Sequence, residues 1–359
     1  MTPAATALSP AKTSIVVSVA QDPAAAENFF KRALLVTSAV KLLLAAIVPF
    51  TTDEAYFVLW GRRLDYGYYD HGAMTGWWMW FMLLFGDSAF LLRLPAVAVS
   101  QFAGWGLWRM LRPIDPAKAG WAATLYLVSP LNLFIFPITT DTPLLFFSVV
   151  AVMFTLRGVQ GGRLIDYGLA GLALGFAFLS KYFAVLLGVS FAVLLLGCVG
   201  RPRIKELAIL LSGIVPGVAV NVAWNYHHSW TNILFNLYTR QEKTGFSLVP
   251  PLLFLGTIAV LAGPGVIRAL LRPQSHDAIS ASTAWRSLRA NGSIVLALAF
   301  AFPMAIFLVV AFGHEIGVHW VLSFFQFLSA LLFAFFGADG LRRMIRPTAI
   351  YTAVPVTLV

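Results

Sequence analysis

Long apolar runs recur along the chain from Ala33 onward, and each is long enough to cross a bilayer as a helix. A helix satisfies its own backbone hydrogen bonds in lipid, so runs of this kind predict an all-α, polytopic membrane protein. Only 11% of the 359 residues are charged, whereas a soluble domain carries about a quarter. The composition therefore excludes a soluble enzyme, a disordered protein and a nucleic-acid-binding domain, although the formal net charge is +10.

Basic residues at the ends of the apolar runs predict which side of the membrane each loop faces. Loops rich in Lys and Arg stay in the cytoplasm. Basic residues bound the stretch 118–157, whose apolar sequence breaks at Asp141, and this fits two spans joined by an outer turn. The stretch 163–201 repeats the pattern with a break at Lys181. Both breaks are therefore expected on the extracytoplasmic side.

The same reasoning gives a map of the whole chain. The expected spans are 33–50, 88–108, 119–136, 142–157, 164–180, 182–199, 206–225, 248–267, 292–312 and 320–338, with an eleventh beginning near 348. Residues 1–30, which include Lys12, are expected to form a disordered cytoplasmic tail, and 31–359 a bundle of about 10–11 helices. No cleavage site follows the first span, so we expect an uncleaved helix rather than a signal peptide.

Ionisable residues gather on the predicted outer face. The first external segment, 51–87, should carry two helices on the membrane surface, at about 54–65 and 72–86, because its tryptophans favour the interface. A second external segment spans 226–247. The acidic residues expected outside are Asp53, Glu54, Asp65, Asp70, Asp87, Asp141, Glu242 and Glu315. Charges at the outer ends of spans, rather than at their midpoints, predict a site at the membrane boundary instead of an ion pathway.

A reaction at this boundary needs a carboxylate to deprotonate or orient a nucleophile, cations to hold an anionic leaving group, and an apolar groove for a lipid tail. Asp53 or Glu54 can supply the carboxylate. The candidate cations are Lys181, Arg62, Arg63 and Arg93. A polyprenyl-phosphate sugar donor has both an anionic headgroup and a long tail, so it fits this combination.

These residues also have structural interpretations that stay open. Acidic residues favour a helix N-terminus, which fits Asp53 and Glu54. Lys181 fits a lysine that extends to the interface, and Asp141 fits a turn. The single cysteine, Cys198, excludes a disulfide and a cysteine metal site. A divalent metal stays open without clear support, because the ligand spacing around His227, His228, His314 and His319 is poor.

Five motifs occur in order along residues 30–340. They are Asp53-Glu54-Ala-Tyr-Phe-Val-Leu-Trp with Gly67-Tyr-Tyr-Asp70-His71 and Arg93-Leu-Pro95; Thr140-Asp141-Thr-Pro143; Gly171-Leu-Ala-Leu-Gly175 with Ser180-Lys181-Tyr182; Trp224-Asn225-Tyr-His227-His228-Ser-Trp230; and Val318-His319-Trp320. This series resembles the GT-C class of glycosyltransferases that use polyprenyl-phosphate sugars, a class related to protein O-mannosyltransferases and the lipid A aminoarabinose transferase.

The resemblance implies an enzyme of the inner membrane that moves a sugar from a polyprenyl-phosphate carrier to a lipid A, cell-envelope glycan or protein acceptor. The reaction would occur on the periplasmic face, with inversion at the anomeric carbon. The resemblance and the charge pattern together predict three groups of site residues. The catalytic carboxylates are Asp53, as general base, with Glu54 and Asp141; the donor phosphate contacts are Lys181, Tyr182, Arg62 and Arg93; the cavity lining is Tyr69, Asp70, His71, Asn225, His228 and His319.

Two features depart from the family pattern. Gly72 follows Asp70-His71 where the family commonly has proline, and family enzymes are usually longer, so we expect a short variant or a truncated chain. Two alternatives stay open, namely a lipid-linked-sugar flippase and a non-catalytic relative that binds polyprenyl phosphate. A transporter should show internal repeats and helices broken in mid-membrane, and no convincing repeat is evident.

Overall fold

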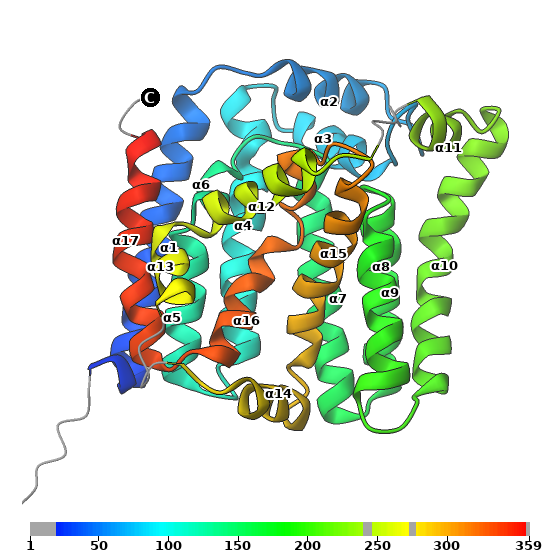
Figure 1. Ribbon diagram of the computed structural model, residues 1–359. Coiled ribbons are helices and arrows are strands. Elements are labelled where there is room, and N and C mark those ends of the chain that lie inside the picture. The colour runs from blue at the N-terminus through cyan, green and yellow to red at the C-terminus, as the bar shows by residue number, and fades with distance from the viewer. Residues whose placement is uncertain (1–18, 240–245, 273–277, 357–359) are drawn as a thin grey trace, which may run out of the picture.

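The computed structural model describes residues 19–239, 246–272 and 278–356, and these form a bundle of helices without β-strands (Figure 1). Lys12 and most of the expected tail lie outside the described residues, as do Arg240, Glu242 and Lys243 of the second external segment. The all-α membrane fold predicted from the apolar runs is confirmed.

The helices follow the chain in this order: α1 (Pro23–Ile47), α2 (Thr52–Arg62), α3 (Met74–Leu83), α4 (Ala89–Leu111), α5 (Pro116–Leu127), α6 (Pro130–Phe134), α7 (Asp141–Gly161), α8 (Leu164–Phe178), α9 (Ala184–Val193), α10 (Ile204–His227), α11 (Thr231–Leu234), α12 (Val249–Ala262), α13 (Pro264–Leu271), α14 (Ala281–Ala290), α15 (Ile294–Ala311), α16 (Leu328–Phe335) and α17 (Ala338–Val356). A π-helical turn, Leu194–Cys198, extends α9, and short 3-10 turns occur at Val318–Trp320 and Phe325–Phe327.

Four of the described helices, α4, α7, α10 and α15, are long and apolar enough to cross a membrane. The number rises to six if each of two bent pairs is one span: α1 with α2, bent by 84°, and α12 with α13, bent by 109°. Further apolar helices, among them α8, are shorter than this criterion. The expected number of spans, ten or eleven, therefore includes several helices that do not meet it alone.

Several expected boundaries are wrong. The helix expected at 33 already begins at Pro23, where Asp22 caps its N-terminus through the N–H of Ala24, so helix replaces part of the expected tail. The expected span 248–267 bends sharply at Gly263. The expected span 320–338 consists of 3-10 turns followed by the short α16, and the last helix begins at Ala338 rather than near 348.

The two surface helices expected in segment 51–87 are present as α2 and α3, which lie across the upper end of the bundle (Figure 1). Thr51 begins α2 with a capping box: its hydroxyl accepts the Glu54 N–H, and the Glu54 carboxylate accepts the Thr51 N–H. This cap turns the chain away from α1 and fixes where the first acidic residues lie.

Helices α8 and α10 pack backbone to backbone through two glycine pairs four residues apart, Gly171 with Gly175 and Gly213 with Gly217. A Cβ on Gly171 would lie 1.9 Å from the Leu210 carbonyl oxygen. Small residues at this spacing let membrane helices approach closely. Lys181 follows the end of α8, and Asn225 lies near the end of α10. The glycine contact therefore fixes the positions of these two residues relative to each other.

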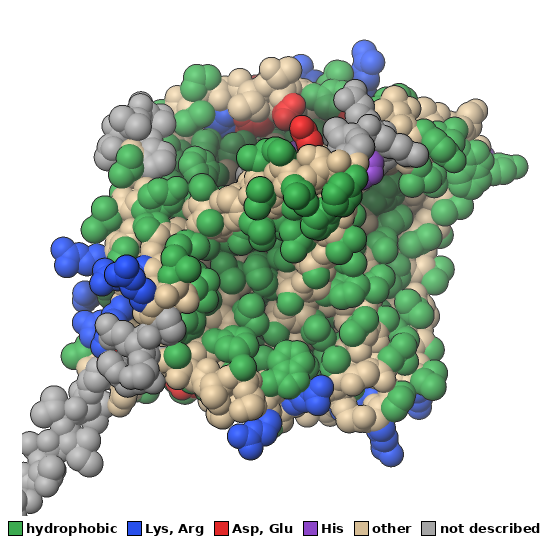
Figure 2. All heavy atoms as spheres, viewed as in Figure 1, with side chains coloured by type: hydrophobic (Ala, Val, Ile, Leu, Met, Phe, Trp, Pro, Cys, Tyr) green, Lys and Arg blue, Asp and Glu red, His purple; other side chains and the backbone are tan. Residues whose placement is uncertain are grey.

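The charged side chains are distributed unevenly over the molecule. Figure 2 shows most of the visible Lys and Arg at the lower end and on the left, and the visible acidic side chains mainly at the upper end near α2. A positive lower end and an acidic upper end agree with the distribution expected across a membrane.

Candidate active site

Asp53 and Glu54 follow each other in the first turn of α2, yet their side chains lie in different environments. Successive residues on a helix point about 100° apart, since a turn takes about 3.6 residues. The Asp53 side chain is exposed, whereas Glu54 is fully buried. The two carboxylates therefore cannot share one function.

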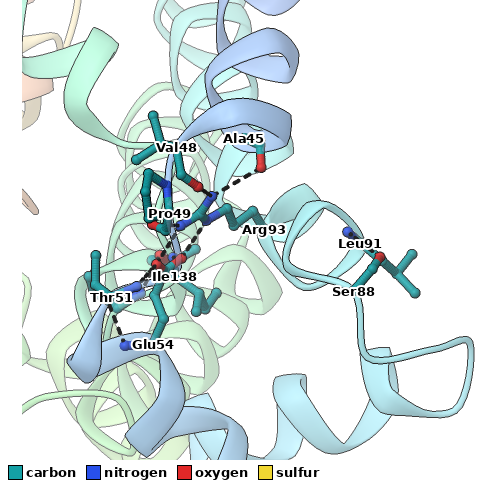
Figure 3. Close-up of polar contacts among 11 residues, drawn as sticks. Ala45, Val48, Pro49, Thr51, Glu54, Ser88, Leu91, Arg93 and Ile138 are labelled. Atoms are coloured by element: carbon teal, nitrogen blue, oxygen red, sulfur yellow. Dashed lines mark hydrogen bonds and ion pairs between the residues drawn. The ribbon is translucent and has the colours of Figure 1, made fainter. Parts of the chain in front are cut away.

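Glu54 forms a buried ion pair with Arg93 of α4 (Figure 3). Arg93 Nε donates to Glu54 Oε1 and Nη2 donates to Oε2, both at 2.7 Å. The remaining guanidinium N–H groups donate to the backbone carbonyl oxygens of Ala45, Val48 and Pro49, with N···O distances of 2.7–3.0 Å. All five N–H donors of the guanidinium are thus used within the protein.

This pair corrects two expectations. Arg93 has no N–H donor left for a phosphate and is fully buried, so it does not contact the donor phosphate. Glu54 accepts from Arg93, from the Thr51 N–H and from the Ile138 N–H, so it is a positioning residue rather than a catalytic one. The pair joins the end of α1, the start of α2 and α4, and so fixes the exposed Asp53.

Arg62 also differs from its expected position. It lies at the C-terminal end of α2, the opposite end from Asp53, and donates to Asp87 at 3.2 Å. Both side chains are more than half exposed, so this is a surface ion pair. Arg62 is therefore engaged by Asp87 at the surface and does not line the cavity that contains Lys181.

Lys181 and Asp141 form a second buried ion pair. Lys181 Nζ donates to both oxygens of Asp141 at 2.9 Å, and the Ser323 hydroxyl donates to Oδ1 at 3.1 Å. Asp141 is the first residue of α7, where a carboxylate is stabilised by the helix dipole. The two breaks in the apolar sequence, at Asp141 and Lys181, thus meet in space.

Lys181 opens onto a cavity of about 210 Å³ near the upper end of the bundle. The cavity is lined by Asp70, His71, Gly72, Lys181, Tyr182, Phe183, Asn236, Leu237 and Trp320. The Lys181 ammonium also lies 5.1 Å from the centre of the Phe183 ring. The lining combines one cation, one carboxylate and an imidazole with aromatic walls.

Asp70 and His71 reach this cavity from a tightly held loop. Gly67 and Gly72 form a β-bridge, and the Asn236 side chain donates to the Asp70 carbonyl at 3.0 Å. Burial opposes ionisation of Asp70, but the adjacent His71 imidazole and the Tyr56 hydroxyl, 3.3 Å from Oδ1, outweigh it and lower its pKa. His71 Nδ1 lies 3.2 Å from Asp70 Oδ2, outside hydrogen-bonding geometry.

Comparisons with known proteins find sequence similarity over part of the chain and a shared fold over most of it. The sequence model of the family described as dolichyl-phosphate-mannose-protein mannosyltransferase matches residues 70–227, which include Asp70, Asp141 and Lys181. A curated relative, the lipid A galacturonosyltransferase RgtD of Rhizobium johnstonii, is 29% identical over 232 residues, or 62% of this chain and 48% of its own length.

Solved structures have the same fold. ArnT from Cupriavidus metallidurans bound to undecaprenyl phosphate superposes with a TM-score of 0.63 at 18% identity, over 85% of this chain and 59% of its own. The archaeal oligosaccharyltransferase AglB from Archaeoglobus fulgidus gives 0.50 at 12% identity, over 92% and 56% of the two chains. The chain therefore has the fold of these proteins and is similar in sequence, over residues 70–227, to the mannosyltransferase family. It spans about half the length of the curated relative.

An asparagine network joins α10 and α11 to the cavity. The single O–H of Tyr182 is shared between the side-chain oxygens of Asn221, at 3.2 Å, and Asn232. Asn232 in turn donates to the Tyr68 carbonyl at 2.7 Å. Asn225 is buried beneath this network and accepts the Ile233 N–H at 3.1 Å. Tyr182 and Asn225 are thereby engaged in positioning the loop that carries Asp70.

Of the six residues expected to line the cavity, Asp70 and His71 do so and the other four lie elsewhere. Tyr69 is half-exposed and packs on Phe235, their ring centres 4.7 Å apart. His228 stacks on the Trp224 ring, with the ring centres 4.1 Å apart. Asn225 is buried within the asparagine network. His319 is exposed beside Trp320, which does line the cavity.

Several residues at the site were not predicted from the sequence. Asn232 and Asn236 lie four residues apart on one helical face, and Ser323 donates to Asp141 from a turn far along the chain. The asparagine spacing is a usable signal, whereas nothing local marks Ser323. Within the described ranges, no group of three or more His, Cys, Asp or Glu side chains could hold a metal ion.

Proposed function

We propose that this GT-C chain is a membrane glycosyltransferase that moves a sugar from a polyprenyl phosphate to a lipid acceptor. The relative named as a lipid A galacturonosyltransferase supports lipid A as acceptor and galacturonic acid as sugar. The ArnT structure bound to undecaprenyl phosphate supports the carrier. The chain would work in the inner membrane with its N terminus in the cytoplasm and its site at the periplasmic face, as the charge distribution favours.

The observation that carries this proposal is the cavity onto which Lys181 opens. The Lys181–Asp141 pair carries no net charge, and an anionic headgroup would approach its ammonium in an aromatic-walled cavity where little water screens the interaction. Asp141 holds the ammonium in place through two hydrogen bonds. A sugar phosphate in the cavity would face Asp70 and His71 on the opposite chain segment.

In the proposed reaction, Asp53 accepts the proton of the acceptor hydroxyl while that oxygen forms a bond to the anomeric carbon. The bond from the anomeric carbon to the phosphate oxygen breaks, and its electron pair stays on the polyprenyl phosphate. Lys181 offsets the charge that develops on this leaving group. A single displacement inverts the anomeric configuration, so one carboxylate base is sufficient.

A transfer assay tests the proposal. The purified chain in detergent is given polyprenyl-phosphate galacturonate and lipid A, and mass spectrometry follows the glycosylated product. Lys181→Ala should raise the KM for the donor at least about tenfold, since a charge-assisted contact is lost, and Lys181→Arg should recover part of it. Unchanged donor dependence in Lys181→Ala would contradict the phosphate contact.

Reconstituted vesicles distinguish the alternatives. If the labelled carrier crosses the vesicle membrane without any transfer to acceptor, the chain is a flippase. Carrier binding without transfer or movement, across a panel of sugars and acceptors, would identify a non-catalytic binding protein. Either result would overturn the proposal.

A further inference from the structure

A second cavity, of about 390 Å³, lies between α13 and α17, away from the site described above. Five arginines are among its lining residues: Arg268, Arg272, Arg342, Arg343 and Arg346. Arg268 lies on α13 and Arg272 directly follows its C-terminal end, whereas Arg342 and Arg346 lie four residues apart on one face of α17. We refer to this cavity as the arginine groove.

The groove exists because α13 packs directly against α17. The chain turns by 109° at Gly263, whose φ of +80° suits glycine. A Cβ on Gly265 would lie 2.1 Å from the Met344 carbonyl oxygen, so only glycine permits this approach. The close contact brings the arginines of the two helices to the same opening.

Three of the arginines that line the groove have no carboxylate partner among the described residues. Arg268, Arg272 and Arg346 are exposed and form no ion pair with a carboxylate in the part of the chain that the structure describes. Arg342 lies 5.8 Å from the centre of the Trp121 ring. Like charges repel, whereas a phosphate accepts bidentate hydrogen bonds from guanidinium groups. The groove therefore favours an anion.

The other lining residues add an apolar wall, formed by Phe336, Met344, Ala269 and Pro347. Figure 2 shows basic side chains gathered on the left, over α13 and α17, beside hydrophobic side chains. A lining that contains both arginines and apolar side chains matches a molecule with an anionic head and an apolar tail. Basic pockets between membrane helices recognise anionic lipid headgroups in this way.

We propose that the arginine groove binds the phosphate-bearing headgroup of an anionic phospholipid from the adjacent leaflet. Native mass spectrometry of the purified full chain tests this by counting bound cardiolipin against bound phosphatidylcholine. The groove variant is Arg268→Gln/Arg346→Gln. The matched control is Arg109→Gln/Arg201→Gln, which removes the same charge at two exposed positions outside the groove.

The wild type and the control should bind cardiolipin with the same Kd and in preference to phosphatidylcholine, and the groove variant at least about tenfold more weakly. Thermal unfolding without lipid checks that both variants are folded. If the double variant does not fold, Arg268→Gln and Arg346→Gln are measured singly, each with an expected loss of at least about threefold.

Three results would overturn the proposal. One is no preference for cardiolipin over phosphatidylcholine in the wild type. Another is an equal loss of binding in the groove variant and the control, which would indicate unspecific attraction to charge. The third is displacement of cardiolipin by equimolar inorganic phosphate or glycerol 3-phosphate, which would identify a soluble phosphate as the ligand.

Discussion

At the residue scale, the adjacent carboxylates of one motif lie in different environments. The sequence assigns Asp53 and Glu54 to the same site, but helix geometry directs one to the surface and the other to Arg93. Sequence alone could not predict this, because Arg93 lies 39 residues further along the chain. Lys181 and Asp141 are the opposite case, since both mark breaks in apolar sequence and do lie together.

Loss of the buried Arg93 charge should destabilise the protein strongly. Arg93→Met leaves the Glu54 carboxylate buried and unpaired, which costs about 3–5 kcal/mol in comparable sites. Arg62→Met removes the exposed pair with Asp87 and should cost at most about 1 kcal/mol. Chemical unfolding in detergent measures both. Equal effects of the two substitutions would show that the Glu54–Arg93 pair does not hold α2.

The lowered pKa of Asp70 predicts a dependence of stability on pH. A carboxyl with a lower pKa in the folded than in the unfolded state stabilises fully above its unfolded pKa of about 3.9, and loses this contribution as pH falls through the folded value. Between pH 5 and pH 3, the unfolding midpoint should fall more in the wild type than in Asp70→Asn. The exposed Asp87→Asn should keep the wild-type slope, and an identical slope in Asp70→Asn would refute the prediction.

At the scale of elements, the loop that carries Asp70 and His71 is held by backbone contacts on both sides. The Met74 N–H donates to the Leu179 carbonyl at 3.1 Å, next to Gly72. This contact joins the loop to the end of α8, from which Lys181 follows. Gly72, where the family commonly has proline, therefore lies at a close backbone contact that leaves no room for a side chain.

Gly72→Ala should disturb this junction. Its Cβ would lie 2.1 Å from the Leu179 oxygen, a backbone atom that cannot rotate away, so we expect a loss of about 1–3 kcal/mol and weaker donor use. Gly161→Ala is the control, because nothing lies within 4 Å of a Cβ there. Thermal unfolding and the transfer assay measure both. If Gly72→Ala matches Gly161→Ala, the junction tolerates a side chain and the close contact is not required.

Apolar periodicity and charge placed most elements near their true positions, including both surface helices. These two signals did not predict the bend at Gly263 or the 3-10 turns before α16. Both depend on packing against helices distant in sequence. A Cβ at position 263, for example, would lie 2.9 Å from the Thr348 side chain of α17. A short apolar run by itself does not reveal such breaks.

At the scale of the whole molecule, the fold class and the similarity to a known family were predictable because five motifs occur in order between long apolar runs. The sequence was less informative about which of the motif residues lie close together in the structure. Asp70, His71, Lys181 and Tyr182 share a cavity, whereas His228 and His319 lie outside it. Pairings such as that of Ser323 with Asp141 depend on the arrangement of α7 relative to a turn near α16. No local sequence pattern encodes that arrangement.

The most direct test of the proposed reaction is the turnover of Asp53→Asn with polyprenyl-phosphate galacturonate and lipid A. Asparagine preserves the shape but cannot accept the proton, so kcat should fall by about 10²–10⁴. The unfolding midpoint should stay unchanged, because Asp53 is exposed. Asp87→Asn, in the same external segment, should retain wild-type kcat. Turnover by Asp53→Asn at the wild-type rate would contradict the account.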